Sequence, residues 1–263
     1  MSRCFDSNHL SYSRDRVFDE CQFKAHIHDK GLVKGTVNAK MLIGSVVDAY
    51  VSAALAGSPI SEEDAWNNTL REMESRYKVI LPEPLAAMET SHNFILVADK
   101  EVIPVLRDEV VEAQPEWHFE IDGAQYHAHP DFITRGGAIL DLKTTYRSID
   151  AQRVHIDGQL TAYAYAYTTQ FGKLPTQVGL VGLVSKRTGV TQESFMGYRS
   201  QAQIDAWLAD TKTRLAARRW SEESGEFLRQ GRVSTFACNG CAVQPTCPSW
   251  AGTNLAIDST LGE

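Results

Sequence analysis

The sequence predicts an α/β protein in which a mixed β-sheet is flanked by helices. Three observations predict this class: helical segments precede a set of short β-like runs, one helix interrupts those runs, and a long helix follows them. The chain has 263 residues, of which 43% are hydrophobic, so it can bury a substantial core. We therefore expect one domain.

The individual helices are predicted from apolar residues that recur every three or four positions. Residues 38–56 should direct Met41, Leu42, Val46, Tyr50 and Val51 toward the core, a second helix should begin after Ser61, and a third should span residues 84–111. Strands are expected at residues 117–121, 125–134, 138–144, 177–185 and 190–198, with helices at residues 149–168 and 200–224.

We divide this single domain into four parts. An N-terminal segment (1–37) contains Cys21, and a helical part (38–112) follows it. The core that contains the sheet covers residues 113–199, and the last helix with a cysteine-containing tail covers residues 200–263. No internal repeat or low-complexity stretch interrupts this order.

The most informative stretch is a predicted hairpin that carries two acids and a lysine. Gly136 and Gly137 separate two apolar runs, which is a strong turn signal. Asp141 and Lys143 are two positions apart on the second strand and therefore share a face, and the hairpin can bring Asp131 beside them. Asp-x-Lys alone also occurs on solvated strand faces, so companion residues have to support the assignment.

The chemistry of these side chains predicts a divalent metal site. Two nearby carboxylates repel each other unless a cation lies between them, and hard oxygen donors suit Mg²⁺ or Mn²⁺ better than zinc. A metal held by Asp131, Asp141 and the main-chain carbonyl of Leu142 would activate water, while Lys143 would orient that water or offset charge on the phosphorane. The reaction implied is hydrolysis of a phosphodiester.

The helix predicted at residues 149–168 supplies two companions. Gln159 and Tyr163 are neighbours at i and i+4, and a helix that packs back on the sheet could bring both to the metal pocket. Ile156, Leu160 and Tyr167 share the apolar stripe with Tyr163, so Tyr163 can also be read as a core aromatic and Gln159 as a surface residue.

These residues resemble the motifs of the PD-(D/E)XK nucleases, and within them the RecB-like branch with CRISPR-associated and AddB-type iron–sulfur nucleases. Pro130-Asp131, Asp141-Leu142-Lys143 and Gln159 through Tyr163 match that family's motifs in order. The resemblance implies a restriction-endonuclease-like core. It extends to Gly44 through Asp48, where Asp48 replaces the usual histidine and could bind metal directly, through water or not at all.

The cysteines provide a second signal. Cys238, Cys241 and Cys247 have the CxxCxxxxxC spacing, and Cys21 could be a distant fourth thiolate. Four sulfurs suit a [4Fe–4S] cluster or a structural zinc. The resemblance favours the cluster, as a clasp between the N-terminal segment and the C-terminal tail, with Cys4 as the rival to Cys21. A disulfide framework is not expected, because five cysteines without a signal sequence indicate a reducing compartment.

The charge of the chain argues against broad electrostatic binding of long duplex. The net charge is −7 and the pI is about 5.6, so a nuclease would need a local positive track. Basic residues considered for such a track are Arg147, Arg153, Lys186, Arg187, Arg214, Arg218 and Arg219. This charge favours a narrow, metal-dependent grip on single strands or ends.

Other residues are further candidates for the site. Glu120 could be a further acid, and His127 and His129 could face the site or only line a strand. The tryptophans Trp117, Trp207, Trp220 and Trp250 are expected in the core or at its edge.

Two functions follow. The first is a Mg²⁺- or Mn²⁺-dependent DNA nuclease, an exonuclease on single-stranded DNA or DNA ends in recombination, repair, phage replication or CRISPR adaptation. The alternative is a cysteine-clasped nucleic-acid-binding or scaffold protein without cleavage. No apolar run reaches the roughly 20 residues of a membrane span, so we expect a cytoplasmic protein without a membrane partner. Homo-oligomers or recombination and CRISPR proteins are its expected protein partners.

Overall fold

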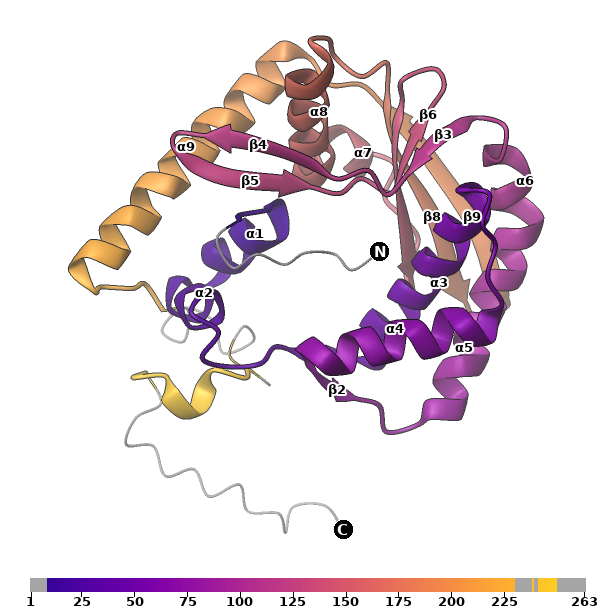
Figure 1. Cartoon of the computed structure of the whole chain (residues 1–263), viewed down its shortest axis with the longest axis horizontal. Helices are drawn as coiled ribbons and strands as arrows, with labels where there is room; N and C mark the ends of the chain where they lie inside the picture. The colour runs from indigo at the N-terminus through magenta and orange to yellow at the C-terminus, as the bar shows by residue number, and fades with distance from the viewer. Residues whose placement is uncertain (1–8, 230–237, 239–240, 250–263) are drawn as a thin grey trace.

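The computed structural model describes residues 9–229, 238 and 241–249. Its centre is a five-stranded sheet with the order β3-β6-β7-β8-β9 (Figure 1). The strands are β3 (Val110–Ala113), β6 (Phe132–Thr134), β7 (Ile139–Thr145), β8 (Val178–Lys186) and β9 (Gly189–Gly197). The β7–β8 pair is parallel and the other pairs are antiparallel, which confirms the predicted mixed α/β fold.

Helices cover both faces of this sheet. The first face carries α3 (Ala39–Leu55) and α5 (Pro84–Val97), with α4 (Glu62–Arg76) packed against α3. The other face carries α7 (Arg153–Ile156) and α8 (Gly158–Phe171), which supply the crossover that a parallel β7–β8 pair requires. The last helix, α9 (Gln201–Ser224), packs on α8.

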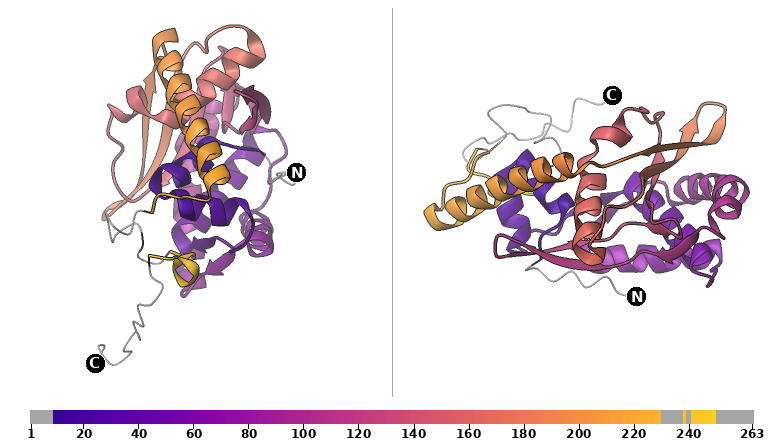
Figure 2. Two further views of the ribbon diagram at one scale, coloured as in Figure 1. Left: turned by 90° about the vertical axis from the view of Figure 1, so that its left-hand side faces the viewer. Right: turned by 90° about the horizontal axis from the view of Figure 1, so that it is seen from above.

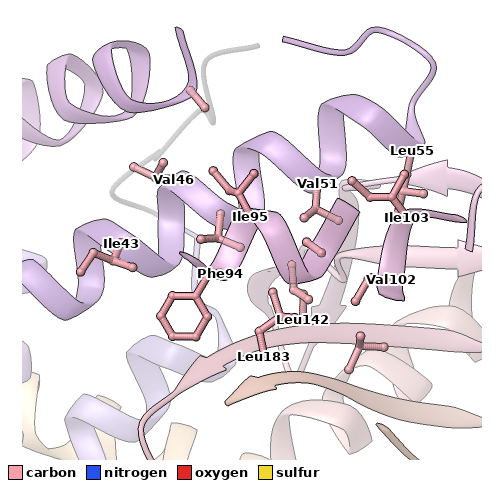
Figure 3. Packing of buried hydrophobic residues seen from close by; sticks show 14 of the residues in the cluster. Ile43, Val46, Val51, Leu55, Phe94, Ile95, Val102, Ile103, Leu142 and Leu183 are labelled. Carbon is pink, nitrogen blue, oxygen red and sulfur yellow. The ribbon is translucent and has the colours of Figure 1, made fainter. Parts of the chain in front are cut away.

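Two apolar clusters fill the layers on either side of the sheet. On the α3 face, Val46, Val51 and Phe94 pack over Leu142 and Leu183 of the sheet (Figure 3). On the α8 face, the cluster is formed by residues such as Leu160, Tyr163 and Leu180. The hairpin of β4 (Trp117–Ile121) and β5 (Ala124–Ala128) closes this second layer, because its inward-facing side chains join the same cluster.

The N-terminal segment folds against the C-terminal helix. It forms α1 (Tyr12–Glu20) and α2 (Gln22–Asp29), and α9 runs beside both of them (Figure 2). Arg214 pairs with Asp19 at 2.7 Å, and Arg218 pairs with Asp29 at 2.7 Å. The N-terminal helices and α9 are therefore joined by ion pairs.

Several predicted elements differ in their bounds. The region predicted as one helix at residues 84–111 instead forms α5, a π-helix (Ala98–Val102), α6 (Ile103–Leu106) and the start of β3. The strand predicted at residues 125–134 is interrupted at Pro130, because proline has no N–H to donate to a neighbouring strand. Two short parallel strands were not predicted. They are β1 (Thr36–Asn38), before α3, and β2 (Lys78–Ile80), after α4.

Two predicted core residues are exposed. Ile156 has an exposed fraction of 81%, because the predicted helix is split at Asp157, whose side chain caps α8. Met41 has an exposed fraction of 53%, since it lies in the first turn of α3. None of the helices in the described part of the chain is long and apolar enough to cross a bilayer.

Candidate active site

The predicted hairpin is formed by β6 and β7. Phe132 pairs with Leu140 and Ile133 pairs with Ile139, and Gly137 adopts a φ of 78° in the turn. This left-handed conformation strains residues with a Cβ, which explains a glycine there. Asp131 lies just before β6, so it reaches the first half of β7 across the hairpin.

The hairpin brings the two acids and the lysine together. Asp131 Oδ2 accepts a hydrogen bond of 2.6 Å from the main-chain N–H of Leu142. Lys143 Nζ lies 2.7 Å from Asp141 Oδ2, and the Asp141 side chain is only 2% exposed. A buried acid is thus paired with a lysine on the same face of β7, as the period of a strand requires.

Burial and mutual repulsion shift the pKa values of this cluster. Burial, followed by the charges of Asp48 and Asp141, raises the pKa of Asp131 well above its ordinary value. Burial also raises the pKa of Asp141. Burial alone would lower the pKa of Lys143, but the carboxylates of Asp141 and Asp131 raise it above its ordinary value. These shifts are those of clustered carboxylates that a cation would stabilise.

Gln159 and Tyr163 extend this cluster as a chain of hydrogen bonds. Lys143 Nζ donates to Gln159 Oε1 at 3.2 Å, and Gln159 Nε2 donates to Tyr163 OH at 2.6 Å. Tyr163 OH donates in turn to the carbonyl of His129 at 2.9 Å. This series of hydrogen bonds therefore links Lys143 to the backbone just before Pro130 and Asp131. Tyr163 is both a buried core aromatic and a polar neighbour of the site.

The start of α8 is fixed by two residues outside the cluster. Asp157 Oδ1 accepts hydrogen bonds from the main-chain N–H groups of Gln159 and Leu160, which is a helix N-cap. Arg199 is 4% exposed and donates to the carbonyls of Val154 and Asp157. Both contacts hold the turn from which Gln159 projects.

Asp48 reaches the site from the opposite layer. It lies on α3 one turn after Gly44, and a methyl group on Gly44 would lie 2.9 Å from Thr144 Oγ1 of β7. The glycine therefore allows α3 to approach the sheet closely. This gives a structural reason for the glycine of the motif that the sequence resembles.

Gln114 is a neighbour of the site that the sequence did not reveal. Its Nε2 donates to Asp48 Oδ2 at 2.7 Å, and its main-chain N–H donates to the carbonyl of Asp131 at 2.7 Å. Its φ is 52°, a conformation that is uncommon for a residue with a side chain. No pattern in the sequence marks this position, because its role depends on a loop conformation and on contacts with two distant segments.

A cavity of about 1370 Å³ lies at this cluster. The predicted residues among its lining are Asp48, Asp131, Asp141, Leu142, Lys143, Gln159 and Tyr163. The donor set is composed of carboxylate oxygens, which fits a hard divalent cation. Among the described residues, no three His, Cys, Asp or Glu side chains are arranged as a metal-binding group; the donor set predicted at the hairpin uses two carboxylates and a carbonyl.

The four described cysteines do not form such a group either. Cys21 Sγ lies 3.9 Å from the carbonyl of Leu228, which follows α9, while Cys241 lines the large cavity. Cys4 lies outside the described residues. The structure thus brings Cys21 to the segment that leads to the other cysteines, without gathering their sulfur atoms.

The basic residues proposed for a positive track do not line the cavity. Five of them are engaged in ion pairs with neighbouring acids: Arg153, Lys186, Arg214, Arg218 and Arg219. Arg147 and Arg187 are exposed elsewhere on the surface. Any positive track in this cavity has to come from other residues.

The remaining candidates divide between the cavity and the surface. His127 and His129 line the cavity, whereas Glu120 is exposed and accepts a hydrogen bond from Gln125. Burial, followed by the charge of His129, lowers the pKa of His127 to about 4, so it is neutral at pH 7. Trp117 is in the core and Trp207 lines the cavity, but Trp220 is exposed; Trp250 lies outside the described residues.

The fold and this site define a nuclease of the α/β class, in which acids and a lysine from one hairpin meet a glutamine from the following helix. The chain belongs to the PD-(D/E)XK nuclease superfamily, whose family model matches residues 9–248. That match covers most of the chain and confirms the family, while the iron–sulfur branch is not distinguished by it.

Solved structures are similar to this chain at low sequence identity. The crystal structure of a "Putative exonuclease" from Eubacterium rectale has a TM-score of 0.62 and 14% identity, with 89% of this chain and 88% of that chain covered. The crystal structure of an alkaline exonuclease from Laribacter hongkongensis has a TM-score of 0.35 and 12% identity, with 74% of this chain and 93% of that chain covered. No curated protein matches the chain.

Proposed function

We propose that the protein is a Mg²⁺- or Mn²⁺-dependent deoxyribonuclease that acts as an exonuclease on single-stranded DNA or DNA ends. The observation that carries this proposal is the meeting of Asp131, Asp141 and Lys143 in one cavity, with Lys143 Nζ 2.7 Å from Asp141 Oδ2. Members of the superfamily generally use divalent metals such as Mg²⁺, and their substrate is nucleic acid.

The residues divide the work of hydrolysis. Asp131, Asp141 and the Leu142 carbonyl would hold the ion, with Asp48 as a further ligand directly or through water. When bound, such an ion lowers the pKa of a water molecule and neutralises phosphodiester charge. Lys143 would donate to the attacking water or to the phosphoryl oxygen, where negative charge develops.

Gln159 and Tyr163 would keep Lys143 in position. Lys143 donates to Gln159 and is paired with Asp141, so its ammonium group is held by two neighbours before any substrate binds. A preorganised donor loses less free energy to reorganisation when charge develops nearby. Tyr163 contributes through its hydrogen bond with Gln159, which orients the amide.

A cleavage assay tests this function. Purified protein is incubated with end-labelled single-stranded DNA and Mg²⁺ or Mn²⁺, with either the 5′ or the 3′ end blocked. We expect metal-dependent cleavage that one of the two blocks prevents. Binding without cleavage by the unmodified protein would favour the alternative, a nucleic-acid-binding or scaffold protein that has lost catalysis.

We also propose that Cys21, Cys238, Cys241 and Cys247 bind a [4Fe–4S] cluster that clasps the two ends of the domain. What supports this is their spacing, together with the contacts that bring Cys21 and Gln22 to Leu228. The described sulfur positions do not form a ligand set, so no catalytic step depends on a cluster. Analysis of iron and sulfide after anaerobic isolation tests the proposal, and stoichiometric zinc in a colourless protein would reject it.

A further inference from the structure

The active-site cavity has a second, cationic part that is separate from the hairpin. It consists of Lys24 on α2, Lys34 before β1 and Arg76 at the end of α4, which we call the cationic wall. Thr36 and Lys78 are partners in the parallel β1–β2 pair and Tyr77 packs on Gly35, so the segments that carry Lys34 and Arg76 lie side by side. In Figure 1 the β4–β5 hairpin lies above α1 and α2, whereas β2 and the adjoining end of α4 lie below them.

Two members of the cationic wall are partly buried, whereas Lys34 is exposed. The side chains of Lys24 and Arg76 have exposed fractions of 26% and 27%. Their acidic partners, Glu20 and Glu72, each lie 3.3 Å away but do not line the cavity. Ion pairs with solvent-exposed partners are weak, so both cations can contact a phosphate that enters.

This wall changes the charge that a ligand would meet. The described residues that line the cavity include five Lys or Arg and four Asp, which gives a formal charge of +1, whereas the whole chain has a charge of −7. The acids are required where a metal would bind. The cations of the wall therefore provide a place for phosphate groups away from those acids.

Two tyrosines accompany these charges inside the cavity. Tyr77 packs on Gly35, where a methyl group would lie 3.2 Å from its ring, and Tyr12 packs on Gly158, next to Gln159. Both rings are partly exposed to the cavity. Aromatic rings in such a position can stack on unpaired bases, whereas the bases of a duplex are already stacked and paired.

We propose that Lys24, Lys34 and Arg76 form a phosphate-binding subsite for an unpaired DNA strand whose scissile phosphodiester lies at Asp141 and Lys143. This inference rests on the proposed nuclease function and adds the residues that select a single strand. Tyr12 and Tyr77 contact the bases between the two positions.

The test measures DNA binding without cleavage. Fluorescein-labelled oligothymidylate is titrated with Lys34→Gln/Arg76→Gln protein in EDTA, over a range of salt concentrations. Lys173→Gln/Arg187→Gln is the matched control, because it removes the same charge at exposed positions outside the cavity. Loss of two phosphate contacts should weaken binding about 25-fold at 0.1 M salt and reduce the salt slope by about 1.4, since each contact contributes about 0.7.

The outcomes separate this inference from the proposed function. Equal binding by the wall variant and the control would overturn the subsite, even if the unmodified protein cleaves DNA with Mg²⁺. Binding of blunt duplex as tightly as oligothymidylate would also overturn it. If the wall variant loses binding but the unmodified protein never cleaves, the subsite stands and the nuclease activity fails. Lys34→Gln alone, at an exposed position, repeats the test if the double variant unfolds.

Discussion

The close approach of α3 to β7 makes a quantitative prediction about Gly44 and Thr144. A methyl group at Gly44 would lie 2.9 Å from Thr144 Oγ1, which is closer than van der Waals contact. Gly44→Ala gains about 1 kcal/mol of helix propensity but loses about 1 to 3 kcal/mol to overpacking. We therefore expect the single variant to have unchanged or reduced stability.

Removing the hydroxyl should reverse the sign of the effect. In a Thr144→Ala background the methyl group has space, so Gly44→Ala should raise the free energy of unfolding by about 1 kcal/mol. The coupling between the two substitutions is then about 1 to 3 kcal/mol, which a double-mutant cycle measures. Urea unfolding of the four proteins at constant m-value gives these free energies.

The nuclease activity of the four proteins should change in the same pattern as their stability. Asp48 lies one turn after Gly44 on α3, so a displaced helix moves its carboxylate away from Asp131. We expect Gly44→Ala to lower kcat/KM about 10-fold, because small misplacements of catalytic groups are costly, and we expect the double variant to recover. Additive effects, with a coupling below about 0.5 kcal/mol, would refute the contact between α3 and β7.

Three further predictions concern single side chains. Lys143→Ala should reduce DNA cleavage at least about 100-fold while DNA binding in EDTA persists; cleavage close to the unmodified rate would contradict the role of the ammonium group. Gln114→Ala and Gln114→Gly should both weaken Mn²⁺ binding about 10-fold in calorimetry, because each removes the donor to Asp48 Oδ2, whereas recovery in the glycine variant would point to backbone conformation instead. Burial raises the pKa of Asp15 to about 6, against the charges of Arg214 and Arg218 and the hydrogen bond from Tyr126, and the charge of Asp19 adds to the rise. The folded protein then holds this proton more tightly than the unfolded chain, so stability falls as pH rises from about 4 to about 6, by about 3 kcal/mol relative to Asp15→Asn. If the free energies of unfolding of the two proteins changed equally with pH across this range, the raised pKa of Asp15 would be excluded.

The hairpin of the candidate active site could be predicted from sequence because its signals are local. A glycine pair sets the turn, and the alternation of a strand places Asp141 and Lys143 on one face. The spacing of Gln159 and Tyr163 on a helix is equally local, and these two side chains do contact each other. Such patterns depend on a few neighbouring residues rather than on the whole fold.

Features that depend on tertiary contacts could not be predicted from the sequence. Gln114 acquires its role from a left-handed φ and from two partners, Asp48 and Asp131, that are distant in the chain. Ile156 looked like a core residue because Asp157, which ends one short helix and caps the next, also fits a continuous helix. Helix α1 had a usable signal in Ser11, which accepts a hydrogen bond from the N–H of Arg14.

The location of positive charge at the cavity could not be predicted from the sequence either. Arg214 and Arg218 looked available in sequence, but the fold pairs them with Asp19 and Asp29. Lys34 and Arg76 carry no sequence signal, since they come to one cavity only when β1 and β2 pair. Composition gives the total charge of a chain, whereas a cavity selects which charges a ligand meets.

Anomalous diffraction from crystals soaked in Mn²⁺ tests the central claim most directly. We predict a peak about 2.2 Å from carboxylate oxygens of both Asp131 and Asp141, with Lys143 Nζ in the same cavity, and its loss in Asp141→Asn crystals. A Mn²⁺ peak bound elsewhere, with none between these two aspartates at saturating metal, would contradict a metal-dependent site at this hairpin.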